Sequence, residues 1–198
     1  MVTMKALVDY TDSLLSVGQF NDYSPNGLQV EGRPEVRRLV SGVTASLELV
    51  EAAIAAGADA LLVHHGYFWK GENACITGMK RQRLQRLLGT GTSLLAYHLP
   101  LDAHPELGNN TQLARVLGFE RAGCFGDDGG MQLAQYGELS QPVSGQALAQ
   151  QLQGQLGRVP LHFPGPQALI QTVGWCTGAA QTYIEAAVEQ GLDAFISG

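Results

Sequence analysis

Two adjacent histidines, His64 and His65, follow a continuous apolar run over residues 60–63. A short uninterrupted apolar run is typical of a parallel strand that is covered on both faces. In open α/β sheets, ligands bind beyond the carboxyl ends of the strands. The two imidazoles therefore stand where a binding site is expected.

A second pair of polar groups, His98 and Asp102, follows a second predicted strand over residues 93–97. Imidazole and carboxylate together are the ligand set of zinc, iron, manganese and nickel sites. Because the carboxyl ends of parallel strands meet at one edge of a sheet, the spacing predicts a metal site there.

The adjacency of His64 and His65 bears on the number of ions. Neighbouring residues on an extended strand point to opposite sides, so one ion would not easily accept both rings. Two ions can take one ring each, with Asp102 joining from the neighbouring loop, and paired ions in hydrolytic sites lie about 3.5–4 Å apart. The alternative is two histidines satisfied by hydrogen bonds at a strand end.

Other candidate groups have simpler interpretations. His104 and His162 are interpreted as surface residues, and the turn-rich stretch 23–32 is interpreted as a surface hairpin when taken alone. The aromatic triplet at 67–69 is typical of core packing, and the alternative is a surface that stacks on a base. The chain has no phosphate-binding glycine loop and no GxSxG nucleophile motif, so these chemistries are not indicated.

Alternating strand and helix patterns predict the elements that position these groups. Ser46 caps an expected helix that ends at Gly57, and Asn109 or Asn110 caps another that ends near Gly118. This alternation predicts an α/β fold of two similar halves around mostly parallel strands. The expected organisation is a first half with the metal-ligand loops at 1–123, a smaller inserted segment at 124–166 and the start of a second half at 167–198.

The inserted segment breaks the alternation because it is rich in glycine, glutamine and proline. Within it we expect strands over 133–139 and 159–163 around a helix over 144–156.

An internal repeat supports the two halves. The residues Glu51-Ala52-Ala53, Gly57 and Asp59-Ala60 recur 134 positions later, from Glu185 to Ala194. The preceding strand has an offset of 133 when Val43-Thr44 is matched to Cys176-Thr177, which predicts a one-residue difference in the turn. The alternative to duplication is convergence of two strand–helix–strand units on a common pattern.

Composition limits the class of protein. The chain has 198 residues, 45% of them hydrophobic, and a formal net charge of −6. That length supports a substantial core, and the acidic balance gives no general attraction to nucleic acid or to an anionic membrane. Three separated cysteines do not form a disulfide framework and fit a reducing, cytoplasmic location. No apolar run is long enough to span a membrane.

Taken together, several segments resemble the GTP cyclohydrolase 1 type 2 homologue family, the Nif-three-like dinuclear-metal proteins, and are close to its compact bacterial members. The matching segments are spread along the chain: Ser24–Val30, Gly42–Ser46, Asp59–Gly66, His98–Asp102, Gly108–Asn110 and Asp193–Gly198.

The resemblance implies metal ligation by His64, His65 and Asp102. Because metal ligands usually need supporting groups, we expect His98 beside the site as a residue that orients a ligand or donates a proton. It implies two divalent ions, chosen among Fe, Zn, Mn and Mg, and a homo-oligomer in the form of a hexameric ring. It also implies a metal-dependent hydrolase acting on a nucleotide or related heterocycle. The alternative is a non-enzymatic metal-binding ring that acts through partners in a DNA-damage or stress response.

The family completes its metal site with a later histidine and glutamate that this sequence does not reach. The final apolar residues, Ala194 to Ile196, would also be left without a covering helix. We therefore expect residues 1–198 to be a piece of a longer product, truncated at its C-terminus.

Overall fold

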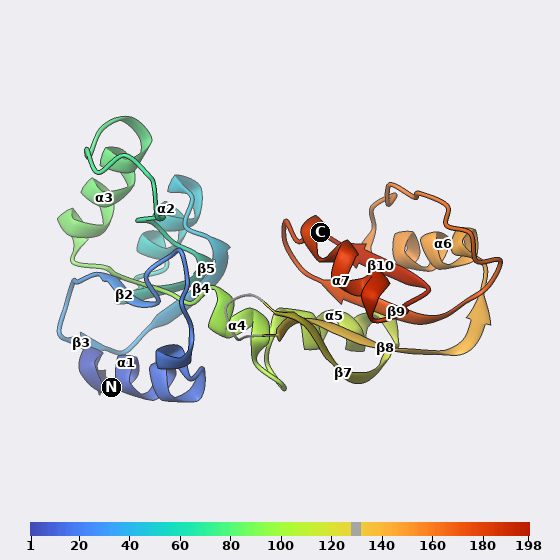
Figure 1. Cartoon of the computed structure of the whole chain (residues 1–198). Helices are drawn as coiled ribbons and strands as arrows, with labels where there is room; N and C mark the ends of the chain where they lie inside the picture. The colour runs from blue at the N-terminus through green and yellow to red at the C-terminus, as the bar shows by residue number, and fades with distance from the viewer. Residues whose placement is uncertain (128–131) are drawn as a thin grey trace. The chain divides into compact units, whose positions relative to one another are not determined.

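The computed structural model describes residues 1–127 and 132–198, which form two compact units, Met1–Leu101 and Asp102–Gly198 (Figure 1). Across these residues it contains seven α-helices and three β-sheets, so the expected α/β class is confirmed. The predicted boundaries at 123 and 166 rest on composition and on the break in strand–helix alternation, and this division does not test them. Each unit is described by itself.

The first unit is built on a four-stranded sheet in the order β2-β6-β5-β4. Strands β4, β5 and β6 are parallel, as predicted, and β2 runs antiparallel beside β6. A two-stranded antiparallel pair, β1 with β3, lies outside this sheet. The strands are β1 (Val2–Thr3), β2 (Gly27–Val30), β3 (Glu35–Val36), β4 (Leu39–Thr44), β5 (Ala60–His65) and β6 (Ser93–Ala96).

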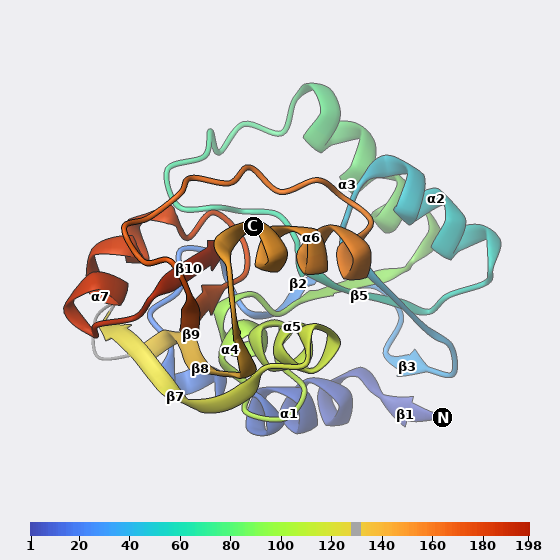
Figure 2. The same cartoon turned by 90° about the vertical axis from the view of Figure 1, so that its right-hand side faces the viewer.

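Helices cover both faces of this sheet, with α1 (Met4–Leu14) on one side and α2 (Leu47–Ala55) and α3 (Gly78–Thr90) on the other (Figures 1 and 2). The side chains of β5 alternate accordingly: Leu61 and Val63 join the core under α2 and α3, and Ala60 joins the core under α1. Burying a side chain of Val or Leu size stabilises a fold by about 1.5–3 kcal/mol. This two-sided burial explains why the strand before the histidines is continuously apolar.

Local sequence signals set the ends of α2. The Ser46 hydroxyl accepts a hydrogen bond from the Leu49 N–H at 3.1 Å, and Glu48 lies in the first turn, where the helix dipole favours negative charge. After the helix, Gly57 adopts a φ of 72°, a left-handed conformation that favours glycine. The helix therefore lies where the sequence predicts it.

The second unit contains a four-stranded sheet in the order β10-β9-β8-β7. Of its three strand pairs, only β9 with β10 is parallel, so the expectation of mostly parallel strands is wrong for this unit. Its strands are β7 (Glu120–Asp127), β8 (Gln132–Val143), β9 (Ile170–Cys176) and β10 (Ala194–Ser197), and its helices are α5 (Asn109–Leu117), α6 (Gly145–Leu156) and α7 (Ile184–Glu189). A short helix, α4 (Leu99–Ala103), links the two units.

Strand β8 accounts for this correction. It follows β7 after a short connection, and a short connection joins only antiparallel neighbours. It then pairs antiparallel with β9 as well. The segment 124–166, which includes the undescribed residues 128–131, thus supplies an inner strand of the sheet.

The predicted helix over 144–156 is confirmed as α6, but the predicted strand over 159–163 is wrong. Leu161 and Phe163 are about four-fifths exposed, at 82% and 79%. Pro160 and Pro164 lack the backbone N–H that a strand ladder needs. The apolar residues that suggested a strand therefore lie in an exposed, irregular segment.

The second unit has its core between the sheet and helices α5 and α6. Trp175 is fully buried there, and its indole N–H donates to the Asn110 carbonyl oxygen at 2.9 Å. Tyr183, just before α7, lies against Gly126 of β7, where a Cβ atom would come within 2.4 Å of its ring. No helix in the described part of the chain is long and apolar enough to cross a membrane.

The internal repeat is visible in the strand pairing. Leu39 pairs with Ala60 in the first unit and Val173 with Ala194 in the second, so both pairs have a separation of 21 residues. The offset of 134 therefore holds in the first strand as well as in the second. The predicted one-residue shift before the helix is wrong, because the match of Val43 with Cys176 followed residue type rather than pairing register.

Candidate metal centre

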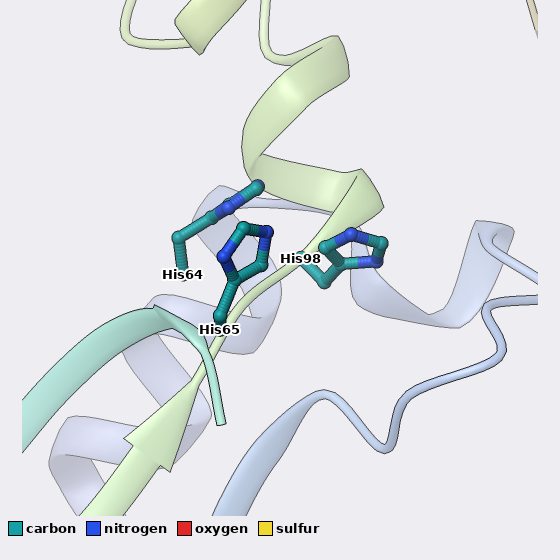
Figure 3. Close-up of side chains that lie close together, drawn as sticks. All are labelled: His64, His65 and His98. Carbon is teal, nitrogen blue, oxygen red and sulfur yellow. The ribbon is translucent and has the colours of Figure 1, made fainter. Parts of the chain in front are cut away.

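Three histidines come together at the carboxyl ends of two neighbouring parallel strands. His64 and His65 are the last residues of β5, and His98 is the second residue after β6. Each offers one ring nitrogen, and these three nitrogens lie within 4.8 Å of one another (Figure 3). The ring centroids are 4.4 Å apart for His64 and His65, 5.0 Å for His64 and His98, and 5.6 Å for His65 and His98.

The proximity of the His64 and His65 rings corrects the expectation that they point apart. Strand alternation fixes the direction of the Cα–Cβ bonds. The imidazole lies beyond two rotatable bonds, and at the end of a strand both rings can turn toward the same space. One ion can therefore reach both side chains, and the argument for two ions from adjacency does not hold.

His98 is held by Asp22, a residue that the sequence analysis did not select. The His98 Nδ1 atom lies 2.9 Å from the Asp22 carboxylate, and the side chains are only 8% and 3% exposed. Burial alone would raise the pKa of Asp22, but hydrogen bonds from His98, Asn26 and the Leu99 N–H outweigh it and lower the pKa. Asp22 is thus an ionised acceptor, which favours a proton on His98 Nδ1 and leaves Nε2 as the atom that can bind a metal.

The loop around Asp22 also fixes the backbone at His98. The Asn26 side chain accepts from the His98 N–H at 2.7 Å and donates to Asp22 at 2.9 Å, while the Leu99 N–H donates to Asp22 at 2.9 Å. The turn-rich stretch 23–32, interpreted as a surface hairpin, therefore supports the site through Asn26. Its closely spaced Ser, Pro, Asn and Gly residues, with Asp22 directly before them, were the available signal.

The loop after His65 is fixed by Gln29 of β2. The Gln29 side chain accepts a hydrogen bond from the Tyr67 N–H at 2.7 Å and donates to the Pro25 carbonyl oxygen at 2.8 Å. A Cβ atom at Gly66 would lie 2.2 Å from Gln29 Oε1, so glycine is required for this approach. His65 itself contacts the Thr44 hydroxyl through Nδ1 at 3.3 Å.

Asp102, predicted as a metal ligand, belongs to the second unit. There its Oδ1 atom accepts hydrogen bonds from the Asn109 amide at 2.7 Å and the Thr177 hydroxyl at 3.3 Å. These contacts fix the carboxylate within its own unit, and its part in a metal site stays a prediction. His104 accepts backbone N–H bonds from residues 106 and 107 and stabilises a local turn.

The donor chemistry of the cluster fits a divalent transition metal. Three imidazoles, one of them oriented by a carboxylate, match the preferences of zinc and iron. His98 thus lies with His64 and His65 in a set that can hold one ion, whereas the sequence predicts it beside the ligands. The number of ions and their identity stay predictions.

Comparison with known proteins gives a consistent match over the whole chain. The sequence profile of the family described as Duf34/NIF3 (NGG1p interacting factor 3) matches residues 2–198. The GTP cyclohydrolase 1 type 2 homolog of Pseudomonas aeruginosa is 51% identical over 197 residues, covering 100% of this chain and 78% of that protein. The protein of the same name from Vibrio cholerae is 54% identical over 202 residues, covering 98% and 77%.

Solved structures agree with this match. A structural-genomics protein described as ybgI, of unknown function, has a TM-score of 0.94 and 47% identity, with 100% of this chain and 78% of that chain covered. The protein TTHA1606 from Thermus thermophilus has a TM-score of 0.84 and 34% identity, again with 100% of this chain and 78% of that chain covered. The family resemblance stated from the sequence motifs is confirmed.

Proposed function

Since this chain belongs to the Duf34/NIF3 family, we propose that it is a metal-dependent hydrolase that acts on a nucleotide or a related heterocycle. The observation that carries the proposal is the set of three ring nitrogens within 4.8 Å at the ends of two parallel strands. The names of the bacterial relatives point to GTP chemistry and motivate the substrate class.

His64, His65 and His98 would hold a divalent ion, and Asp22 would keep His98 in the orientation and tautomer that ligation requires. Such an ion, when bound, lowers the pKa of a water molecule toward 7 and polarises the bond that is attacked. An alternative role for His98 is to donate a proton while His64 and His65 ligate. In either role the hydrogen bond to Asp22 fixes the ring.

We further propose that the complete site is dinuclear, with Asp102 as a ligand and Fe, Zn, Mn or Mg as the ions, in a homo-oligomer of hexameric form. Two hydrogen-bond donors already orient the Asp102 carboxylate, which supports a ligand role. The second candidate function is a metal-binding ring without catalysis that acts through protein partners. The histidine cluster supports it equally, because ligation does not require turnover.

Turnover separates the two functions. The purified protein is loaded with Mn, Fe or Zn and mixed with GTP and other nucleotides, and products and bound metal are measured. The matched variants are a His64→Ala, His65→Ala double substitution and His162→Ala, which removes an exposed histidine outside the cluster. Hydrolysis that the double variant loses together with its metal supports the hydrolase. Metal binding without hydrolysis of any nucleotide favours the ring protein, and equal metal content in all variants contradicts both.

A further inference from the structure

Two aromatic side chains, Tyr23 and Trp69, stand against the histidine cluster. The Tyr23 ring centroid lies 5.1 Å from that of His98, and the Trp69 centroid lies 5.0 Å from it, both edge-on. The two aromatic rings are 5.9 Å from each other, and Trp69 is also 5.9 Å from His65. Together they form an aromatic wall on one side of the cluster.

We propose that this aromatic wall binds a planar heteroaromatic ring of the substrate and holds it beside the histidines. The inference rests on the proposed hydrolase function and adds the residues that select the substrate. A flat π system stacks on exposed aromatic faces with little dependence on its substituents. Tyr23 and Trp69 are thus specificity-determining residues, whereas the histidines hold the metal.

The backbone around the wall is arranged to present these rings. Phe68 adopts a φ of 67°, a left-handed conformation that is unusual for a bulky residue. It separates Tyr67, whose hydroxyl donates to the Ala45 carbonyl oxygen at 2.8 Å, from Trp69 at the cluster. The Lys70 N–H then donates to the Tyr23 carbonyl oxygen at 2.8 Å. Two segments far apart in sequence are therefore tied together at the point where their aromatic rings meet.

The exposure of the wall distinguishes it from core packing. Tyr67 and Tyr97, which pack in the core, are 5% and 0% exposed, but Tyr23 is 51% exposed and Trp69 is half-buried. Covering aromatic surface that is exposed to water with a flat ring lowers the free energy of the complex, which favours binding. A wall that served only to shield the metal would keep both rings buried.

Tryptophan content makes the proposal directly testable. The chain has two tryptophans, Trp69 and Trp175, and Trp175 is fully buried in the second unit. When the protein is labelled with fluorotryptophan, fluorine NMR gives one resonance from Trp69 at the wall and one from Trp175, which serves as an internal reference. The Trp69→Phe variant lacks the wall resonance and so assigns it. The probes are guanosine 5′-monophosphate and ribose 5-phosphate, which differ by the heteroaromatic ring, and metal is removed with a chelator.

We expect guanosine 5′-monophosphate to shift the Trp69 resonance in a saturable way while the Trp175 resonance stays constant and ribose 5-phosphate shifts neither. Tyr23→Ala should weaken this binding by about 10–100-fold, and Tyr23→Phe should restore it, because stacking needs the ring alone. Tyr10→Ala, at an exposed tyrosine of α1, is the matched control and should leave binding unchanged. An unmoved Trp69 resonance, an equal shift with ribose 5-phosphate or unchanged binding in Tyr23→Ala would each overturn the inference.

This test separates the wall from the hydrolase function. Ring binding at Trp69 without hydrolysis of any nucleotide under any metal would support the wall and contradict the hydrolase. Hydrolysis with the same KM in wild type and Trp69→Ala would support the hydrolase and overturn the wall.

Discussion

The two repeated strand–helix–strand motifs, β4–α2–β5 in the first unit and β9–α7–β10 in the second, share a backbone arrangement but differ in the side chains that they present. Each has an aspartate before its second strand, and the carboxylate accepts hydrogen bonds from two backbone N–H groups. For Asp59 the donors are residues 37 and 38, just before β4, and for Asp193 they are residues 171 and 172, at the start of β9. The strands that follow pair in the same register. The first motif ends its second strand in His64 and His65, and at the offset of 134 the residue that corresponds to His64 is Gly198.

The strands that pair beside each motif also differ. In the first unit β5 lies between two strands parallel to it, so its carboxyl end meets that of β6 and brings His98 to His64 and His65. In the second unit, within the described residues, β10 has one neighbour, and the next strand beyond β9 runs antiparallel. In the first unit, the strand β6 beside the repeated motif therefore completes the histidine cluster.

The largest difference should appear in stability at one pair of equivalent positions. Trp175 on the inner strand β9 corresponds, at the offset of 134, to Ser41 on the edge strand β4. Trp175→Ala should cost about 3–5 kcal/mol because it removes a fully buried ring. Ser41→Ala should stay within about 0.5 kcal/mol because Ser41 is exposed. Denaturant unfolding of both variants checks this, and costs of similar size would contradict the edge and inner assignment.

Removing one imidazole should have the next largest effect. His98→Ala removes the imidazole that follows β6. If His98 is a ligand, as proposed, metal affinity should fall by more than about 100-fold, beyond the loss typical of residues that only orient a ligand. Titration with Zn or Mn measures the affinity, and His162→Ala serves as the control. A loss below about tenfold would show that His98 does not bind the metal and that the β5 histidines suffice.

Helix α2 and the parallel strands β5 and β6 of the first unit could be predicted because their signals are local. The cap at Ser46, the glycine at 57 and the apolar run before His64 each act over a few residues. The direction of strand pairing in the second unit could not, because β8 carries no local mark that distinguishes an inner strand from an insertion. The strand predicted over 159–163 is wrong for the same reason, because an apolar residue type does not determine which part of the fold it packs against.

The candidate site was predictable at the level of strand ends and no further. Strand periodicity places His64, His65 and His98 at one edge of a sheet, but side-chain torsions decide that the His64 and His65 rings meet. Asp22 lies 76 residues before His98, and no spacing rule links them. The two become partners because β2 enters the sheet beside β6, which is a property of the folded topology.

A smaller effect is expected from Asp22, which supports the metal site without belonging to the strand ends. Asp22→Asn keeps the shape of the side chain but weakens its acceptance of the His98 Nδ1–H, so we expect metal affinity to fall by about 10–100-fold. The matched control is Asp12→Asn. Asp12 accepts a hydrogen bond from Tyr97, the residue before His98, at 2.8 Å, and its substitution should leave metal affinity unchanged. Equal losses in both variants would mean that general loosening of β6, rather than orientation of His98, sets the affinity.

The smallest effect should come from the two aspartates that the repeat shares. Backbone N–H bonds lower the pKa of Asp59 and of Asp193 in the folded protein. A lowered folded pKa stabilises the fold above the unfolded value of about 3.9, and this stabilisation is lost as the pH falls through that value toward the folded pKa. Asp59→Asn and Asp193→Asn should therefore lower the melting temperature at neutral pH, and the difference from wild type should shrink in acid.

Salt should separate the two aspartates. Asp59 also pairs with the Arg33 guanidinium at 3.2 Å, whereas Asp193 accepts from the neutral Thr172 hydroxyl at 3.0 Å. Screening weakens an ion pair near the surface but leaves neutral hydrogen bonds nearly unchanged. Raising the ionic strength should thus reduce the effect of Asp59→Asn more than that of Asp193→Asn, as measured by thermal unfolding at neutral pH. The same salt dependence in both variants would mean that the backbone bonds common to the two units, and not the added arginine, set the contribution of each carboxylate.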